Sequence, residues 1–379
     1  MLVNKTYKFR MYLTKEQEHI VNKFIGSSRF IYNYYLYENK DNKFFNYYDA
    51  SKDLVRLKEE NEWLKEVDSC LLKNTLKDLS LGYDRYNKGQ GGYPRYKKKS
   101  LNGSYRTTAI RSTYKGKENC SIEVDLERNL IKLPKLKEVK IRGYRNLSTF
   151  PHKILNAIIS KEAGRYYVSV CAVEDIPYKE FTLRNVVGID LGIKNLVVTS
   201  DGIKYNKMAN LDKIEKKLKG LNKWLSRSQK GSKNREKIIL KIERLNMKLK
   251  NLRKYRVHEI TSTLVKDNDL IITETLKVNN MVKNHHLSKR ILHSSLSEII
   301  RQLEYKCKWF NKKLIKIDTF YASSQICNHS GYKNRKVKDL SVRKWTCENC
   351  KSELDRDINA AINIEWEGVT KYFREQYSN

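Results

Sequence analysis

The sequence has little of what marks a secreted, membrane-spanning or low-complexity protein. Only 4 of its 379 residues are Pro and 16 are Gly, so a repetitive or linker-dominated chain is excluded. No apolar run approaches the ~20 residues needed to span a bilayer. The N-terminus, MLVNKTYKFRMYLTKEQE, lacks the apolar core of a signal peptide. We therefore expect a cytoplasmic protein with no membrane partner.

Acidic residues are scarce beside basic ones. The chain has 77 Lys and Arg but 43 Asp and Glu, a formal net charge of +34, and 25 of its residues are Tyr. Charge on this scale repels itself in a compact protein unless a polyanion neutralises it, so nucleic acid is the expected partner. The hydrophobic content of 40% still allows a buried core. At about one domain per 150 residues, the length predicts two or three domains.

Disulfide bonds are not expected, because the seven cysteines are an odd number in a chain without a secretory signal. Four of them are scattered along the sequence, and we expect these to be buried thiols: Cys70, Cys120, Cys171 and Cys307.

The pattern along the chain predicts two regions that meet near residue 180. Residues 1–14 and 101–180 are rich in strand-like alternation, whereas residues 15–100 carry mostly helical spacing. The helical part ends in KGQGGYPRYKKKS (residues 88–100), where basic and aromatic side chains gather after two glycines and a proline. We expect this segment to bind nucleic acid through Tyr93, Arg95, Tyr96, Lys97, Lys98 and Lys99.

The second region opens with two predicted strands in VVGIDLGIKNLVVTSDG and continues with a strong helical signal over residues 207–256. Apolar residues recur there every three or four positions on both sides of a polar break, which predicts an antiparallel helical hairpin with an apolar seam. The expected seam residues are Leu211, Ile214, Leu218, Leu221, Leu225, Ile238, Ile242, Leu245, Leu249 and Leu252. Strands over 269–276 and 313–321 should follow, separated by an exposed loop with His285 and His286 and by a helix up to residue 312.

The hairpin carries charge of almost one sign. Residues 207–256 hold 18 Lys and Arg but 4 Asp and Glu, a net charge of +14. A solvated face is the ordinary explanation for charged runs, but repulsion within this one favours a neighbouring phosphate backbone. We expect nucleic-acid contacts around the break, at Arg227, Lys230, Lys233 and Arg235.

Three acidic residues stand at the ends of predicted elements. Asp190 ends the strand VVGID, Glu274 lies near the end of LIITETL, and Asp357 opens the helix DINAAINI. Carboxylates that converge at one edge of an α/β sheet supply the oxygen ligands that Mg²⁺ prefers. Two such ions ~3.5–4 Å apart can hold both the attacking and the leaving oxygen of a phosphodiester. The sequence therefore predicts a magnesium-dependent nuclease site, with two ions.

Each acid has a simpler explanation when it is taken alone. Asp190 could cap a turn, Glu274 could be a surface strand residue and Asp357 could be a helix N-cap. The segment GIDLG also opens actin-like ATPases, but the sequence offers neither the second phosphate loop nor the Gly-rich adenosine motif of such enzymes. The three acids in this order, with RDINAAIN last, favour the nuclease.

A second group of candidate metal ligands lies just before the last helix. Cys327 and Ser330 bound one short motif, CNHS, and Cys347 and Cys350 bound another, CENC. Two CxxC knuckles let four thiolates reach one tetrahedral zinc ion. The second knuckle is intact, but the first has Ser330, whose hydroxyl is a poor zinc ligand. The open alternatives are a fourth ligand from His329, a three-thiolate site completed by water, and a ribbon without metal; we expect zinc, held weakly.

Together these motifs resemble one known family. Segments similar to those of TnpB, the OrfB-type protein of bacterial insertion sequences and a relative of compact type V CRISPR effectors, are RFIYNYYL, GGYPRYKKK, VVGIDLGIKNL, TETLKVNNMVKN, FYASSQIC and DRDINAAINI. The resemblance covers nearly the whole chain. It implies that Asp190, Glu274 and Asp357 match the family's carboxylate triad; Asp357 is preferred to Asp355 because it directly precedes the INAA run.

The resemblance also implies an architecture. Residues 181–379 would form an α/β RNase H-like (RuvC) nuclease domain with a zinc-ribbon-like insert at 322–354. Residues 1–180 would form a β-barrel-like domain from 1–14 and 101–180, with residues 15–100 as a helical recognition insert.

The implied function is that of a transposon-encoded RNA-guided DNA endonuclease associated with transposition. Its partners would be a guide RNA from the transposon end and double-stranded target DNA, so that base pairing selects the sequence. We would expect such a bacterial protein near the nucleoid. The alternative is a cleavage-inactive RNA-guided repressor, which the missing zinc cysteine favours and the intact acidic triad disfavours.

Overall fold

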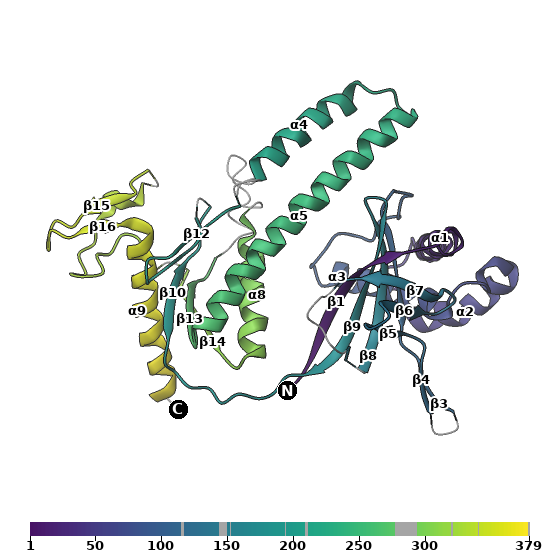
Figure 1. Cartoon of the computed structure of the whole chain (residues 1–379), viewed down its shortest axis with the longest axis horizontal. Coiled ribbons are helices and arrows are strands. Elements are labelled where there is room, and N and C mark those ends of the chain that lie inside the picture. Colours follow the sequence, from purple (N-terminus) through teal and green to yellow (C-terminus); the bar gives the residue numbers. More distant parts are fainter. Residues whose placement is uncertain are drawn as a thin grey trace. The chain divides into compact units, whose positions relative to one another are not determined.

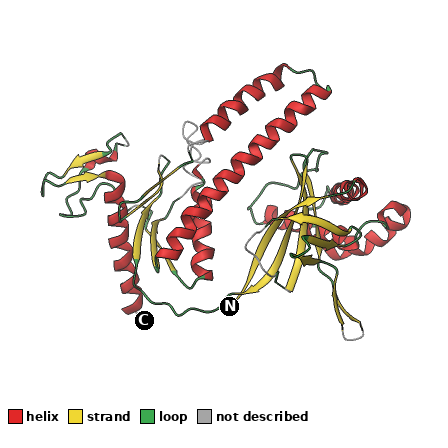
Figure 2. Ribbon diagram, viewed as in Figure 1, coloured by secondary structure: helices red, strands yellow, loops and turns green. Residues whose placement is uncertain are grey.

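The computed structural model separates into two compact units, Leu2–Asp175 and Ile176–Asn379, with Met1 assigned to the second. We call them the N-terminal and C-terminal units (Figures 1 and 2). The structure describes residues 1–114, 117–143, 150–151, 153–193, 195–208, 211–276, 294–319, 321–339 and 341–377. His285 and His286 lie outside these residues, as does the end of the TETLKVNNMVKN segment.

The N-terminal unit is built on a seven-stranded antiparallel sheet with the order β2-β8-β9-β1-β7-β6-β5. The first strand of the chain lies inside this sheet, between the strands that come last and third from last in the unit. Alternation along β1 buries Tyr7, Phe9 and Met11 on one face. The strands are β1 (Leu2–Tyr12), β2 (Gly103–Thr108), β5 (Glu123–Asp125), β6 (Leu130–Leu133), β7 (Lys137–Arg142), β8 (Lys153–Glu162) and β9 (Arg165–Asp175), with a separate hairpin of β3 (Arg111–Tyr114) and β4 (Lys117–Cys120).

Helices between β1 and β2 share the core of this sheet. They are α1 (Lys15–Glu38), α2 (Tyr47–Glu60), the 3₁₀ turn η1 (Glu62–Leu64) and α3 (Ser69–Asn87). Thr14 and Gln17 form a capping box that starts α1. Helices α1 and α3 contact each other and β2, and the Asn74 amide donates to the Arg106 carbonyl at 3.2 Å.

The C-terminal unit contains a five-stranded mixed sheet with the order β12-β11-β10-β13-β14. The three strands β10, β13 and β14 are parallel, and β11 and β12 extend the sheet in antiparallel pairs. Both faces are covered: Ile271 packs with α5 and α8, whereas the next residue, Ile272, packs with α9. The strands are β10 (Val186–Asp190), β11 (Asn195–Thr199), β12 (Lys204–Asn206), β13 (Leu270–Glu274) and β14 (Lys313–Ile317), and the covering helices are α8 (Leu296–Trp309) and α9 (Arg356–Tyr377) with part of α5.

The basic hairpin consists of α4 (Leu211–Arg227) and α5 (Lys233–Asp267) (Figure 1). All ten expected seam residues lie in one apolar cluster between these helices. The expected end of the second helix at residue 256 was wrong, because α5 continues for eleven more residues. Those residues carry a second apolar face, including Val257, Ile260 and Leu264, that packs on α8 and the sheet.

Glycine lets α9 lie against the sheet. A Cβ atom on Gly188 of β10 would fall 2.2 Å from the Ala361 carbonyl oxygen, and one on Gly368 would fall 2.1 Å from Ile272. The glycine of VVGID is therefore explained by helix packing, which removes the reason for assigning it to an ATP phosphate loop.

The insert before α9 has a core of its own, formed by Cys327, Val337, Trp345, Cys347 and Leu354. Its regular elements are short: η2 (Arg335–Lys338), β15 (Lys344–Thr346) and β16 (Glu353–Asp355). Among the described helices of the chain, none is long and apolar enough to cross a membrane.

Candidate functional sites

The carboxyl ends of two parallel strands bring two of the predicted acids together. Ile189 of β10 is in register with Thr273 of β13, so the next residues, Asp190 and Glu274, are neighbours at one edge of the sheet. Helix α9 packs on both strands, and Asp357 lies in its first turn. Segments more than 160 residues apart in the sequence thus contribute to one edge.

Charge at this edge is poorly compensated. Burial raises the pKa of Asp190 to about 8, assisted by the carboxylates of Glu274 and Asp357 and opposed by Arg356. Burial likewise raises the pKa of Glu274 to about 7. Both acids are thus held where a negative charge is unfavourable without a nearby cation. A bound divalent ion would relieve this cost, so the donor set fits Mg²⁺.

The three carboxylates are not packed around a single point. Among the described residues, only a group of cysteines brings three possible ligand atoms all within 4.8 Å of one another. The acids are therefore spaced more widely than ligands that all bind one ion. Such spacing is compatible with ligands distributed over two ions.

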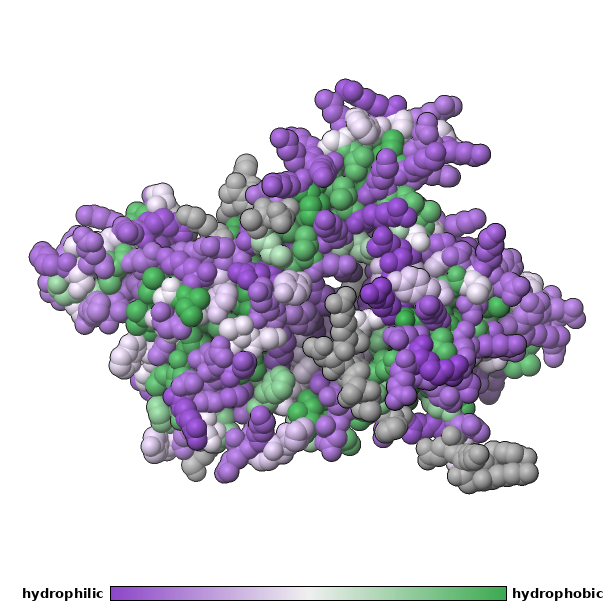
Figure 3. All heavy atoms as spheres, viewed as in Figure 1, coloured by the Kyte–Doolittle hydropathy of each residue, from purple (hydrophilic) through white to green (hydrophobic). Residues whose placement is uncertain are grey.

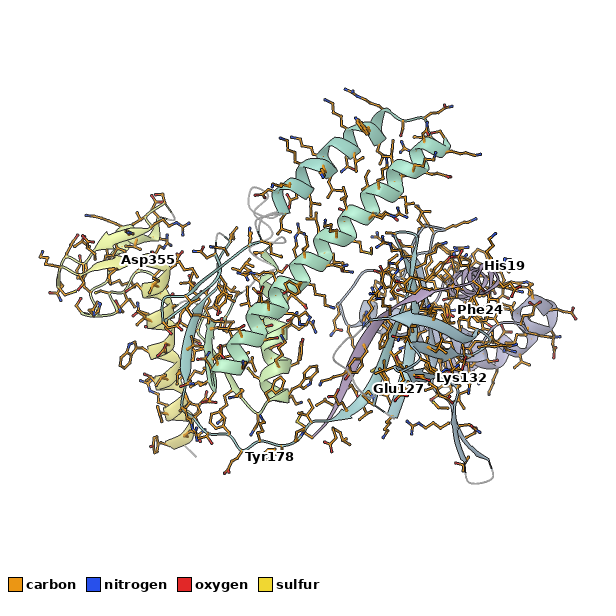
Figure 4. All side chains as sticks on the ribbon, viewed as in Figure 1. His19, Phe24, Glu127, Lys132, Tyr178 and Asp355 are labelled. Carbon is orange, nitrogen blue, oxygen red and sulfur yellow. The ribbon has the colours of Figure 1, made fainter. Side chains whose placement is uncertain are left out.

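Asp355, which ends β16 just before α9 (Figure 4), has a different environment from Asp357. One oxygen of Asp355 accepts the backbone N–H groups of Asp357 and Ile358 at 3.1 and 3.2 Å, and the other accepts the Lys204 ammonium at 2.7 Å. Asp355 therefore caps the N-terminus of α9. Among the described residues, the side chain of Asp357 receives the longer contacts from Asn195, at 3.4 Å, and Arg343, at 3.3 Å. This difference supports Asp357 as the metal ligand.

The structure also explains residues of the DRDINAAINI motif to which we had assigned no role. The side-chain amides of Asn359 and Asn363 both donate to the Ile326 carbonyl, at 2.7 and 2.6 Å, and both are almost fully buried. The Arg356 guanidinium donates to the Asp339 carbonyl at 2.8 Å. These contacts fasten the cysteine-bearing insert to α9. Two asparagines four positions apart, hence on one helix face, were the available signal.

The cysteine group consists of Cys327, Cys347 and Cys350. The sulfur atoms of Cys327 and Cys350 lie 3.6 Å apart, and the Ser330 hydroxyl lies 3.3 Å from the Cys347 sulfur. A tetrahedral zinc ion with Zn–S bonds near 2.3 Å separates its ligand atoms by about 3.8 Å, and by slightly less when one ligand is oxygen. The three thiols and Ser330 therefore have the spacing of a zinc site.

Backbone geometry assigns Ser330 to the fourth corner of this site. The N–H of Gly331 donates to the Cys327 carbonyl at 2.9 Å, and the N–H of Lys351 donates to the Cys347 carbonyl at 3.0 Å. Gly331 and Lys351 both have positive φ, 72° and 61°. The two knuckles thus have the same turn, and Ser330 corresponds to Cys350. His329 is exposed and outside the ligand group, which leaves no support for the Cys3His alternative.

The basic residues of segment 88–100 are exposed, and two of the segment's predicted nucleic-acid residues also anchor it to the helices. The Tyr93 hydroxyl bonds to that of Tyr83 at 2.9 Å, and the Lys97 ammonium lies 4.0 Å from the centre of the Tyr32 ring. The Lys97 backbone N–H donates to Asn33, at 2.8 Å. Tyr93 and Lys97 therefore fix the segment to α1 and α3. All six expected nucleic-acid residues are exposed, and Arg95, Tyr96, Lys98 and Lys99 take no part in the anchoring contacts above.

The hairpin tip shows a similar division. Hydrophilic side chains project from α4 and α5, with hydrophobic residues between the two helices (Figure 3). Arg227, Lys230 and Lys233 are exposed. Arg235 instead donates through one guanidinium nitrogen to the Leu225 carbonyl at 2.6 Å and to the Ser228 carbonyl at 3.1 Å. Arg235 therefore caps the C-terminal end of α4. The sequence pattern did not predict this role.

Three family models match parts of the chain. They are described as a helix-turn-helix domain of the OrfB type (residues 1–42), a probable transposase of the OrfB type (residues 169–285) and a Cas12f1-like TNB domain (residues 297–364). Residues 1–42 contain β1 followed by α1.

Similar proteins cover almost the whole chain. A putative RNA-guided DNA endonuclease of Streptomyces pristinaespiralis is 31% identical over 96% of this chain and 89% of its own length. Putative RNA-guided DNA endonuclease InsQ of Escherichia coli is 29% identical over 95% and 91%. In the cryo-EM structure of a Cas12f1–sgRNA–target DNA complex, one chain has a TM-score of 0.56 at 14% identity, over 96% of this chain and 99% of its own, which shows a shared fold.

The Streptomyces relative is similar over nearly the full length of this chain, and two of the matching family models are of the OrfB type. Both findings agree with the family resemblance of the sequence motifs. The chain therefore belongs to the TnpB, or OrfB-type, family of insertion-sequence proteins.

Proposed function

We propose that this protein is an RNA-guided DNA endonuclease that cuts DNA with magnesium ions held by Asp190, Glu274 and Asp357. The observation that carries the proposal is the grouping of three acids in a chain of net charge +34, where burial, assisted by the carboxylates of Glu274 and Asp357, raises the pKa of Asp190 to about 8. Acids whose charge is only partly compensated are costly to bury, and a repressor that only binds would gain nothing from them. The activity named for the two near full-length relatives supports the same conclusion.

The sheet order of the C-terminal unit supports an RNase H-like (RuvC) nuclease domain. Its first strand, β10, is central, with an antiparallel extension through β11 and β12 on one side and two parallel strands on the other. This arrangement places the ends of β10 and β13 next to the start of α9. The insert 322–354 serves as the zinc-ribbon-like part, and zinc fits its three thiols and Ser330.

The protein's own residues would prepare this edge for the reaction. Asp190, Glu274 and Asp357 would hold the divalent ions, which supply a metal-activated water and neutralise charge on the phosphate. Asp355 and Lys204 fix the first turn of α9 and thereby the backbone of Asp357. Burial of Asp190 and Glu274 keeps water from screening their charge, which strengthens their attraction for a cation.

We assign binding of the guide RNA and the target DNA to the basic surfaces. In the C-terminal unit these are the exposed residues of the hairpin, including Arg227, Lys230 and Lys233. In the N-terminal unit, residues 1–180 as a whole would provide a barrel-like domain with a helical recognition insert, and the exposed part of segment 88–100 would contact phosphates.

The test uses purified protein, the RNA transcribed from the adjoining transposon end, Mg²⁺ and a labelled DNA duplex matching the guide. We expect guide-dependent cutting that stops when Mg²⁺ is omitted. Binding of the duplex without cutting, at any Mg²⁺ concentration, would instead establish the repressor.

A further inference from the structure

Arg343 of the insert contacts a proposed magnesium ligand. Its guanidinium lies 3.3 Å from one oxygen of Asp357, with the Arg343 side chain 48% and the Asp357 side chain 19% exposed. The arginine therefore places a positive charge where a divalent ion would bind the same carboxylate. An arginine and an ion that approach one oxygen must compete for it.

The position of Arg343 depends on the insert. The Arg343 carbonyl accepts the N–H of Arg356 at 2.9 Å, and the next residue, Lys344, begins β15, which leads through Trp345 to Cys347. Arg343 directly precedes this strand, and Cys347 directly follows it, four residues from Arg343. This short strand therefore connects the cysteine group to Arg343.

Apart from its contacts with α9, the insert has only a small core of its own. Its core comprises five buried residues, two of which are the thiol ligands Cys327 and Cys347. Cores of this size depend on a bound ion for their stability. With Ser330 in place of a fourth thiolate, the ion should dissociate more readily than from a four-cysteine ribbon.

Asp357, in contrast, is positioned by contacts outside the insert's core. Helix α9 packs tightly on β10 at Gly188, and Asp355 pairs with Lys204 of β12. Loss of order around the cysteines would therefore release Arg343 without displacing Asp357.

We propose that the insert is a zinc-responsive brake on the magnesium site, an inference that rests on the site proposed above. With zinc bound by Cys327, Cys347, Cys350 and Ser330, the insert holds Arg343 against Asp357 in competition with magnesium. When zinc is lost, Arg343 leaves and the carboxylate becomes fully available.

The experiment measures metal binding and uses Mn²⁺ as the probe for the carboxylates. Full-length protein is loaded with zinc, or stripped with a chelator that is then removed, and is titrated with Mn²⁺ by electron paramagnetic resonance. We expect stripping to tighten Mn²⁺ binding about two- to fivefold, the range given by a partly exposed ion pair. Adding zinc back should restore the weaker binding.

Three variants separate the steps of the proposal. Ser330→Cys should lose zinc to the chelator at least about tenfold more slowly, because a fourth thiolate replaces a poor ligand. Arg343→Gln should bind Mn²⁺ about two- to fivefold more tightly while zinc is bound, and should not respond to stripping. Lys338→Gln removes an exposed charge from the same insert and should behave as the unaltered protein.

Equal Mn²⁺ affinity in the zinc-loaded and stripped protein would overturn the brake. A zinc-loaded Arg343→Gln protein that binds Mn²⁺ no more tightly would also overturn it, and that measurement needs no stripping. Cutting is not a readout here, so the two proposals can fail separately. Protein that shows these Mn²⁺ responses and yet cuts no DNA would refute the proposed function alone.

Discussion

The carboxylate edge and the basic hairpin of the C-terminal unit both carry charge that the fold compensates only in part, but with opposite signs. At the edge, burial and mutual repulsion raise the pKa of Asp190 to about 8. On the hairpin, 18 basic residues face 4 acidic ones between positions 207 and 256. From this incompletely compensated charge we infer the partners proposed above, a divalent cation at the edge and a polyanion on the hairpin.

Charges that the fold does compensate are a useful contrast. Asp355 caps α9 and pairs with Lys204, and Arg235 closes the end of α4. Each lies within a few residues of a proposed functional residue of the same charge. The four predictions below test this distinction, beginning with the largest effect.

Asp190→Asn should reduce guided DNA cutting by at least about 10³-fold, because loss of a proposed metal ligand removes several kcal/mol of transition-state stabilisation. Guide RNA binding should stay unchanged, since Asp190 lies at the sheet edge and makes no phosphate contact in the proposal. Cutting rates and RNA affinity are measured side by side. Asp212→Asn, at an exposed position of α4, is the matched control. Cutting that survives Asp190→Asn would remove the edge as the nuclease site.

The triple variant Arg227→Gln, Lys230→Gln, Lys233→Gln should weaken guide RNA binding on the order of 10–100-fold at physiological salt. Each lost phosphate contact lowers the slope of log affinity against log salt by about 0.7, so the slope should fall by about 2 in total. Filter binding between 50 and 300 mM salt measures both. An unchanged slope would mean that the hairpin tip does not contact the RNA.

Without magnesium, the carboxylate edge should make the protein less stable as pH rises. The pKa values of Asp190 and Glu274 in the folded protein, about 8 and about 7, lie above those of an unfolded chain. The folded state therefore binds more protons, and the free energy of unfolding should fall from about pH 4 to about pH 8.

Thermal unfolding in magnesium-free buffer at several pH values tests this dependence. Asp190→Asn should flatten it and stabilise the metal-free protein at pH 8 by about 1–3 kcal/mol. With added Mg²⁺, the unaltered protein should be more stable than the Asp190→Asn variant. If the stability of the unaltered protein and that of the Asp190→Asn variant depend on pH in the same way, the fold fully compensates the acids at the edge.

Arg235→Gln should lower thermal stability by about 1–2 kcal/mol, because the carbonyls at the end of α4 lose a charged donor. Its effect on the salt slope of RNA binding should be smaller than that of Arg227→Gln measured alone. A larger effect of Arg235→Gln than of Arg227→Gln on the salt slope would mean that Arg235 contacts the RNA.

The elements with strong apolar periodicity could be predicted from the sequence. The seam of the hairpin was predicted residue by residue, because each seam residue follows from the repeat of the helix and the neighbouring helix is adjacent in the sequence. Sequence reasoning missed the continuation of α5 to Asp267, since those residues change partners from α4 to α8. Periodicity shows that a face is apolar but does not name the element that covers it.

The identities of the candidate ligands came from the sequence, because Asp190, Glu274, Asp357 and the cysteines have chemistry that does not depend on the fold. Only the tertiary structure decided how they are used. In the fold, the Ser330 hydroxyl lies next to the Cys347 sulfur and His329 is exposed. Asp355 caps the N-terminus of α9, and Arg343 contacts Asp357. These outcomes depend on distances between residues far apart in the chain, which are fixed by packing such as that of Gly188 against α9 and not by any local pattern.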